Sequence, residues 1–354
     1  MGTFIPGVEL SRRFYVEAVL PVVHAHCGEI PHTAARIGPG SEVLGFDTAR
    51  SADHDWGPRL QLFLQPQDQR AQDIVSMLSE ELPKTFYGYP TNLSSAGRVR
   101  FMEFTDGPVS HGVDVTTLDA WFDGHLGFDP RSGVSPFDWL ATPTQVLAEV
   151  TAGAVFHDEL GLTHARSALD WYPEDVWRYV LACQWQRVSE EEAFVGRCGE
   201  VGDELGSAVV AARLVRDLMR LTLLMYRRYP PYSKWLGSAF ARLDFAATPS
   251  LTATLTATTW HDRENHLAKA YTAIGQLHND LGLTAPVDPS TRSYHDRPFQ
   301  VLHAERFSQA LIAGIADPEL RALPLTGAID QFADSTDLLG NRERRRAAAA
   351  ALTV

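Results

Sequence analysis

Residues 38–56 decide the fold and read GPGSEVLGFDTARSADHDW. Gly40 and Ser41 stand near the start of this stretch, and eleven residues later come two acids, Asp53 and Asp55, separated by one residue. Side chains at i and i+2 of a β-strand point to one face, so we expect the two acids to share hard divalent cations. A glycine lets the backbone approach an oxyanion, and a serine donates from its N–H and its hydroxyl. The stretch therefore predicts a phosphate-binding bend beside a magnesium site.

Nucleotidyl transfer also needs a third carboxylate, which helps to activate the attacking hydroxyl. We choose Asp114, because it lies between Val113 and Val115 in an extended segment. Glu103, in the alternating segment 99–104, is the alternative. Two acids separated by one residue are by themselves typical of a turn or a solvated strand end. The Gly-Ser pair and a downstream acid on a strand together favour a site.

These motifs resemble those of the nucleotidyltransferases of the DNA-polymerase-β type, which carry Gly-Ser, a gap of about a dozen residues and two acids separated by one residue. Within that superfamily the chain resembles the domain-of-unknown-function family 4037. Four segments carry this resemblance: Gly38–Asp47, Ser51–Pro58, Phe4–Arg12 and Pro231–Leu236. The resemblance implies an α+β chain, in which a nucleotidyltransferase-fold domain with a small mixed sheet precedes a mainly α-helical region.

The resemblance implies transfer of a nucleoside monophosphate, AMP from ATP, to a hydroxyl or phosphate of a small acceptor. Asp53, Asp55 and Asp114 would ligate Mg²⁺, with two ions expected, and Asp114 would act as general base. Gly40 and Ser41 would hold the β- and γ-phosphates. A non-catalytic nucleotide-binding or sensor module of the same fold is the alternative from a different class.

Residues 1–135 alternate strand-like and helix-like segments, which predicts the catalytic domain there. The expected helices are Leu10–His24, Ala71–Leu82 and Leu118–Leu126, and the expected strands are Leu60–Leu64, 99–104 and Val113–Val115.

Residues 136–354 are predicted to be a helical substrate-binding region, with 136–245 and 246–354 as two candidate subdomains. Ser189 and Glu192 have the spacing of a capping box, which predicts that a helix begins at Ser189. The expected helices are 144–160, 173–188, 207–228, 258–281 and 298–315.

Arg216 and Arg220 lie on one face of the helix expected at 207–228, and Lys234 follows its end. One interpretation is that these cations offset the charge of a triphosphate, for which guanidinium geometry is suited. The other is a solvated or salt-bridged helix face.

The amino-acid composition indicates which kinds of molecule the protein can bind. The net charge of −13 opposes binding to a nucleic-acid backbone and favours a nucleoside triphosphate with a small-molecule acceptor. No apolar run approaches the length of about 20 residues that a membrane span needs, so we expect a cytoplasmic protein. The three cysteines form no CxxC pair, so neither a disulfide framework nor a thiolate zinc site is predicted.

The His-Asp pairs His54-Asp55, His261-Asp262 and His295-Asp296 raise a second enzymatic hypothesis: a metal-dependent phosphohydrolase of the HD type. That chemistry gathers its ligands from helices. The strand expected at Leu60–Leu64, which follows closely, argues against it.

Overall fold

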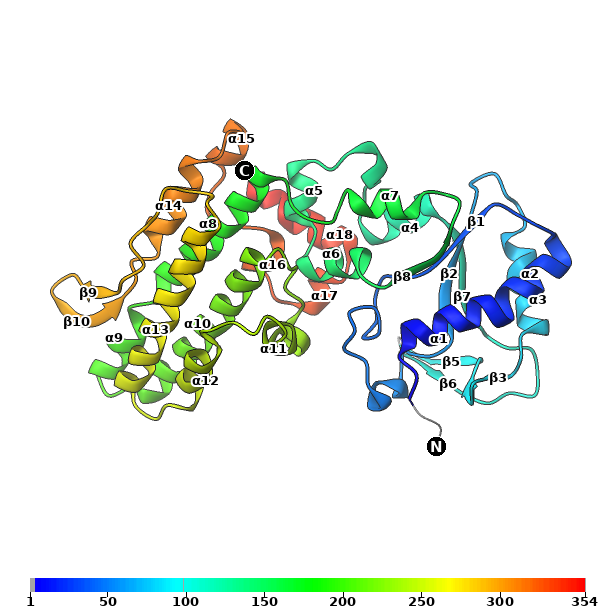
Figure 1. Cartoon of the computed structure of the whole chain (residues 1–354), viewed down its shortest axis with the longest axis horizontal. Helices are drawn as coiled ribbons and strands as arrows, with labels where there is room; N and C mark the ends of the chain where they lie inside the picture. Colours follow the sequence, from blue (N-terminus) through cyan, green and yellow to red (C-terminus); the bar gives the residue numbers. More distant parts are fainter. Residues whose placement is uncertain (1–3, 98, 354) are drawn as a thin grey trace. The chain divides into compact units, whose positions relative to one another are not determined.

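The computed structural model describes residues 4–97 and 99–353. The chain forms two compact units: unit 1 holds the residues up to 134 and 146–170, and unit 2 holds 135–145 and the residues from 171 on. Unit 1 combines a small mixed sheet with helices, and unit 2 is mainly helical (Figure 1), which confirms the α+β class. The boundary expected at 135 lies at the first crossing between the units. Residues 146–170, however, which we assigned to the helical region, belong to unit 1.

The central sheet of unit 1 has the strand order β7-β2-β1-β8. Its strands are β1 (His32–Arg36), β2 (Arg59–Leu64), β7 (Gly112–Thr117) and β8 (Ala154–Asp158). Strand β1 pairs antiparallel with both β2 and β8, whereas β2 and β7 are parallel. The expected strands at Leu60–Leu64 and Val113–Val115 are therefore confirmed as the cores of β2 and β7.

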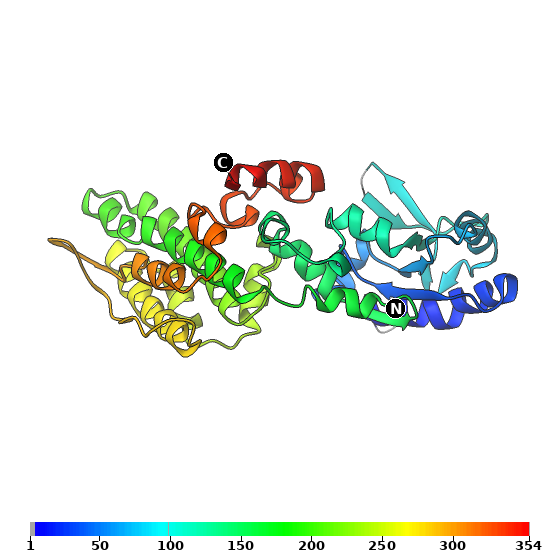
Figure 2. The ribbon, with the colours of Figure 1, turned by 90° about the horizontal axis from the view of Figure 1, so that it is seen from above.

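A long N-terminal helix packs against this sheet. It consists of α1 (Gly7–Phe14), a π-helical turn (Tyr15–Val19) and α2 (Leu20–Cys27). Figure 2 shows this helix, in blue, along one side of the strands of unit 1. Leu10 and Phe14 of α1 share a core with Ile74 of α3 (Ala71–Glu81), and all three are completely buried. Burial of this apolar face is what stabilises the layer.

The remaining elements of unit 1 surround the sheet. Two hairpins, β3–β4 and β5–β6, follow α3 along the chain, and β6 confirms the first four residues of the strand expected at 99–104. The bounds are α3 (Ala71–Glu81), β3 (Thr85–Phe86), β4 (Tyr89–Pro90), β5 (Leu93–Ala96), β6 (Val99–Met102), α4 (Leu118–His125), α7 (Leu162–Ser167) and the 3-10 helices Ala49–Asp53 and Pro130–Ser132.

The helix expected at 144–160 is wrong in its second half. Helix α6 (Thr144–Thr151) ends before Gly153, which has φ +72°, and the chain then enters β8. A Cβ at Gly153 would lie 2.1 Å from the carbonyl oxygen of Arg36, so this close approach to β1 requires glycine. Pairing with β1 makes residues 154–158 an edge strand.

Unit 2 is built on α8 (Glu174–Glu191), α10 (Glu204–Met225), α13 (Trp260–Asp280) and α14 (Glu305–Ala313). Helix α14 packs on α8, and α13 packs on α10, so both proposed subdomains, 136–245 and 246–354, contribute to one packed unit. The green and yellow helices lie side by side in Figure 2. The others are α5 (Pro136–Ala141), α9 (Phe194–Glu200), α11 (Ser233–Ala241), α12 (Thr248–Thr256), α15 (Pro318–Ala322), α16 (Ile329–Phe332), α17 (Thr336–Leu339), α18 (Arg342–Ala349) and the 3-10 helix Ala350–Thr353.

Two further expectations in unit 2 are corrected. The helix expected at 298–315 begins only at Glu305, because a hairpin of β9 (Arg292–Tyr294) and β10 (Arg297–Val301) precedes it. Ser189 does not begin a helix; it lies inside α8, and its hydroxyl donates to the carbonyl of Gln186. The helix continues past Ser189, the residue that we expected to be its N-cap.

Within residues 4–97 and 99–353, every helix is too short or too polar to cross a bilayer.

Candidate functional site

A pocket of about 640 Å³ opens where β1 ends and the parallel strands β2 and β7 begin. Its charged and ionisable lining side chains come from four strands, two loops and one helix of unit 1. They are the arginines Arg36, Arg59 and Arg100, the acids Asp55 and Asp114, and the histidines His111 and His125. Three guanidinium groups against two carboxylates favour an anionic ligand.

A buried ion cluster forms one wall of the pocket. Arg36, at the end of β1, donates from Nε to Glu42 Oε1 at 2.8 Å, and Arg59 donates from Nη2 to the same oxygen at 2.7 Å. All three side chains are buried. Burial lowers the pKa of Arg36 to about 10. Burial alone would raise the pKa of Glu42. The charges of Arg36 and Arg59 stabilise the carboxylate more strongly, so the pKa of Glu42 is lowered. The cluster carries one excess positive charge beside the pocket.

Gly40 lies directly on this cluster. A Cβ at residue 40 would be 2.5 Å from Arg36 Nη2 and 2.6 Å from Glu42 Oε2, so the backbone passes too close for any other residue. Gly40 lines the pocket, as expected for a bend that meets an anion. Ser41 follows it in the chain but is not among the residues that line the pocket. The half-buried Ser41 accepts instead, through its carbonyl, the N–H of Phe46 at 2.8 Å.

Asp114 occupies the position on β7 that pairs in register with Gln61 on β2. Both residues line the pocket. The Asp114 side chain is exposed to the pocket opening, but neighbouring protein atoms still partly desolvate its carboxyl and raise its pKa. The charges of His125 and Arg100 act in the opposite direction. The strand position expected for Asp114 is confirmed. Its rival Glu103 lies outside the pocket lining and accepts the hydroxyl of Ser94.

The expectation that Asp53 and Asp55 lie on a strand is wrong. Asp53 ends the 3-10 helix Ala49–Asp53, and Asp55 has φ +45°, so the i, i+2 alternation of a strand does not apply. Asp55 lines the pocket and accepts the backbone N–H of Arg100 at 3.3 Å. The Asp53 carboxylate is outside that lining and lies 2.8 Å from Nδ1 of His54. The structure therefore brings Asp55 and Asp114 to one pocket and leaves Asp53 outside it.

The local cause is a cap that the sequence analysis missed. Thr48 and Ser51 exchange backbone and side-chain hydrogen bonds, which form a capping box for the 3-10 helix. The Thr48-x-x-Ser51 spacing is a signal that could have predicted a helical turn before Asp53. His54-Asp55 consequently lies in a turn before β2, not in the helical setting that an HD-type phosphohydrolase requires.

Two histidines and a tryptophan complete the pocket. His111 donates from Nε2 to the carbonyl of Val75 at 3.0 Å, and its Nδ1 accepts the N–H of Val113. Burial lowers the pKa of His111, so this ring is held neutral. His125 stacks on Trp121 with ring centroids 4.1 Å apart. None of these side chains belongs to a sequence motif; only the pairing of distant segments brings them together.

The predicted cations of unit 2 have partners of their own. Arg220 is buried and lies 3.0 Å from Asp330, and Arg216 lies 3.6 Å from Asp334. These contacts favour the salt-bridged interpretation of this helix face. Lys234 is exposed on α11, with its ammonium 5.4 Å from the ring centre of Trp235.

The pocket supplies some, but not all, of the oxygen ligands that a magnesium ion needs. Magnesium needs one or two carboxylates together with waters and substrate phosphates, and Asp55 and Asp114 supply two carboxylates facing one space. Among the described residues, the expected group Asp53, Asp55 and Asp114 does not form a three-ligand cluster. The residues present therefore fit an ion that shares its coordination with a bound phosphate.

Comparison with known proteins gives two findings. A solved structure of a nucleotidyltransferase-like protein from Exiguobacterium sibiricum 255-15 is 12% identical to this chain. The match covers 84% of this chain and 88% of that one, with a TM-score of 0.29. No curated protein matches the chain.

The family comparison is more specific. Residues 139–236 match the model of a domain of unknown function, DUF4037. The segment Pro231–Leu236, which carried part of the resemblance, lies inside this match, whereas the Gly-Ser and DxD motifs lie before it. Over residues 139–236 the chain is therefore similar to the DUF4037 family, in agreement with the resemblance that its sequence indicated.

Proposed function

We propose that unit 1 binds a nucleoside triphosphate in this pocket and transfers its nucleoside monophosphate, AMP from ATP, to a hydroxyl or phosphate of a small acceptor. One observation carries the proposal: Asp55 and Asp114 face the same space as Arg36, Arg59 and Arg100. Arginines beside a triphosphate offset its charge, and a carboxylate beside the acceptor takes up a proton.

Each group has a role in this proposal. The acceptor oxygen attacks the α-phosphorus, and the bond from that phosphorus to the leaving pyrophosphate breaks. Asp114 accepts the proton that a hydroxyl acceptor loses. A pKa raised by its partly desolvated position makes Asp114 a better proton acceptor than an ordinary aspartate. Gly40 lets the phosphates approach the backbone above the cluster of Arg36, Glu42 and Arg59.

Asp55 and Asp114 would hold magnesium, which neutralises the charge of the triphosphate and of the leaving pyrophosphate when bound. Because Asp53 lies outside the pocket lining, the ion site rests on two carboxylates of this chain, not on three. Lys234 and Ser41 are not required in this proposal.

A non-catalytic nucleotide-binding module is the second candidate, and a specific observation favours it. The positions of β2 that line the pocket carry Arg59, Leu60 and Gln61, so this strand contributes no carboxylate to it. A pocket richer in arginine than in carboxylate binds a triphosphate without necessarily cleaving it.

The experiment measures ATP binding with magnesium by calorimetry, and pyrophosphate release in the presence of a metabolite extract. We compare the wild type with Asp114→Asn and Asp55→Asn, and use Asp106→Asn, an exposed carboxylate outside the pocket lining, as the matched control. The transferase is supported if Asp114→Asn binds ATP but loses at least a hundredfold in pyrophosphate release. ATP binding without any pyrophosphate release by the wild type supports the binding module. If the wild type does not bind ATP, both functions are rejected.

A further inference from the structure

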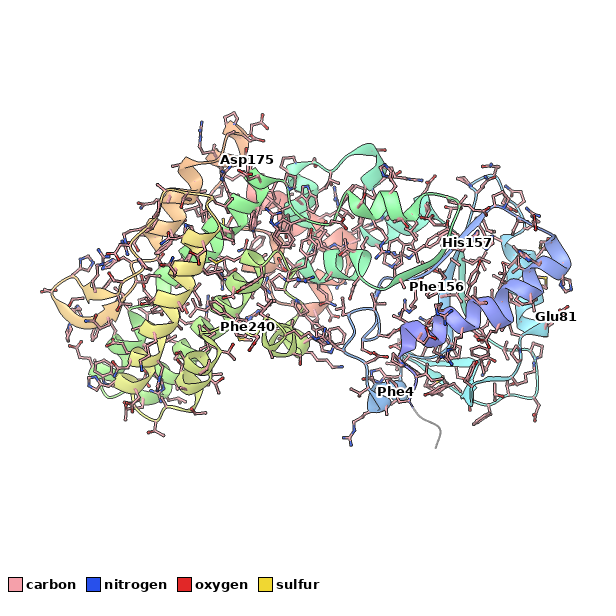
Figure 3. The ribbon with its side chains drawn as sticks, viewed as in Figure 1. Phe4, Glu81, Phe156, His157, Asp175 and Phe240 are labelled. Atoms are coloured by element: carbon pink, nitrogen blue, oxygen red, sulfur yellow. The ribbon has the colours of Figure 1, made fainter. Side chains whose placement is uncertain are left out.

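A second cluster of ligand-type side chains lies in unit 1, away from the pocket. Strand β1 begins at His32 and ends at Arg36, so His32 is at the end opposite to the pocket wall. Beside it, on and just after β8, are His157 and Glu159 (Figure 3 labels His157). One ligand atom from each of these residues lies within 4.8 Å of the other two. No other group of three in the described part of the chain meets this criterion.

The distances within the cluster are short. Nε2 of His157 lies 3.0 Å from Oε2 of Glu159, and Nδ1 of His32 lies 4.0 Å from the same oxygen. The two imidazole rings stack with their centroids 4.4 Å apart. Strand pairing fixes this arrangement, because His157 is in register with Ala34 of β1. The two histidines are thus held by the sheet, and Glu159, just after β8, accepts the backbone N–H of His32 through Oε2 at 3.0 Å.

The ring nitrogens show which atoms are available. Nδ1 of His32 lies 2.8 Å from the carbonyl of Ile30, and Nε2 lies 2.8 Å from the hydroxyl of Tyr15. Nε2 of His157 is shielded from solvent, and despite its short distance to Glu159 it has no well-aligned hydrogen-bond partner. A buried ring nitrogen without a hydrogen bond is unfavourable, and a bound ion would satisfy it.

We propose that His32, His157 and Glu159 bind a zinc ion, through Nδ1 of His32, Nε2 of His157 and a carboxylate oxygen of Glu159. Two imidazoles and one carboxylate form a ligand set that zinc accepts, with water in the fourth position. Glu159 is half exposed, so an ion can reach the site from solvent. Ligands separated by at most 4.8 Å need only small side-chain movements to reach bonding distances of about 2.0–2.2 Å.

Tyr15 supports this assignment because its hydroxyl contacts the other ring nitrogen of His32, Nε2. When Nδ1 binds the ion it gives up its contact with Ile30, and Nε2 then carries the ring proton and donates it to the Tyr15 oxygen. The Tyr15 hydroxyl already lies 2.8 Å from Nε2, and a phenol oxygen can accept as well as donate. An oxygen that orients a metal-binding histidine in this way is a recurrent feature of zinc sites. Tyr15 is a positioning residue here.

The ion would tie residues 157–159 to β1, and so fasten the segment 146–170 to the rest of unit 1. The ligands are contributed by residues more than a hundred positions apart in the sequence. Because the unfolded chain does not hold these groups together, zinc would bind the folded state preferentially and so raise its stability. The proposal does not depend on the proposed nucleotidyl transfer.

The test uses the full-length protein after treatment with a chelator. Zinc binding is measured by calorimetry, cobalt binding by visible absorption, and the melting temperature with and without zinc. The variants are Glu159→Gln and His157→Gln. The control is His164→Gln, an exposed histidine on α7 outside the cluster.

We expect the wild type and His164→Gln to bind one zinc ion per chain and to melt at a higher temperature with zinc. Glu159→Gln and His157→Gln should each bind at least tenfold more weakly. Because Glu159 is half exposed, its variant is expected to fold, and circular dichroism checks this. Tyr15→Phe should weaken binding less than either ligand variant. The proposal is overturned if the wild type binds no stoichiometric zinc, or if both ligand variants bind it as tightly as the wild type.

Discussion

Gln61 on β2 and Asp114 on β7 are directly paired across the two parallel strands that form the floor of the pocket. The Gln61 amide also fixes the end of β1, because its Oε1 accepts the N–H of Ile37 at 3.1 Å and its Nε2 donates to the Ile37 carbonyl at 3.2 Å. Gln61 therefore couples the position of Asp114 to the strand that carries Arg36.

Replacement of Gln61 by alanine should lower the free energy of unfolding by about 1–3 kcal/mol, because the N–H of Ile37 loses its side-chain partner. The Ile37 carbonyl keeps the hydrogen bond from Nη1 of Arg36. Urea denaturation of the purified protein measures this. Gln69→Ala, at an exposed loop position, should change stability by less than about 0.5 kcal/mol. Equal effects of the two substitutions would show that the Gln61 amide does not hold β1.

Glu42→Gln should destabilise the protein by about 3–5 kcal/mol, because Arg36 and Arg59 would remain buried without a compensating charge. The matched control is Glu80→Gln on the exposed face of α3. Thermal unfolding followed by circular dichroism distinguishes the two. A Glu42→Gln protein as stable as its control would contradict the ion cluster described here.

Gly40→Ala should weaken ATP binding at least tenfold, because the added methyl group would displace Arg36 or Glu42 from the pocket wall. Gly124→Ala is the control: no atom lies within 4 Å of the added Cβ, and alanine in helix α4 should instead stabilise by about 0.5–1 kcal/mol. Calorimetric titration with ATP and magnesium gives both affinities. Unchanged binding by Gly40→Ala would exclude this bend from the nucleotide site.

Glu192 in unit 2 should make stability depend on pH. Burial raises the pKa of Glu192 to about 7, although its carboxylate accepts the N–H groups of Leu302 and Ala304. The folded protein thus keeps a proton that the unfolded chain loses near its ordinary value of 4.5. The contribution of Glu192 is fully present below pH 4.5 and falls by about 3 kcal/mol as the pH rises through 7.

Denaturant unfolding at several pH values, compared between the wild type and Glu192→Gln, isolates this contribution. The difference between the two proteins should change between pH 4.5 and 7, whereas Glu190→Gln, at an exposed position, should follow the wild type throughout. A difference that is constant over this window would mean that Glu192 titrates in the same way in both states.

Local patterns were sufficient to predict the longest helices and two strands of the sheet. The period-two segment around Asp114 became β7, and the apolar spacing of 71–82 became α3. These elements form because side chains within a few residues of one another share a face. The same local reasoning missed β8, whose extended form depends on pairing with β1, more than a hundred residues earlier in the chain.

The sequence by itself determined the α+β class, the strand position of Asp114, the glycine bend at Gly40 and the similarity to DUF4037 over residues 139–236. Only the tertiary structure decided that Asp55 shares a pocket with Asp114 while Asp53 does not, and that arginines of three separate segments line the same space. The physical reason is the distance along the chain over which each effect acts: hydrophobic periodicity and capping involve residues within one or two helical turns of one another. The approach of distant side chains depends on strand register and on the balance of buried charges, which no short pattern encodes.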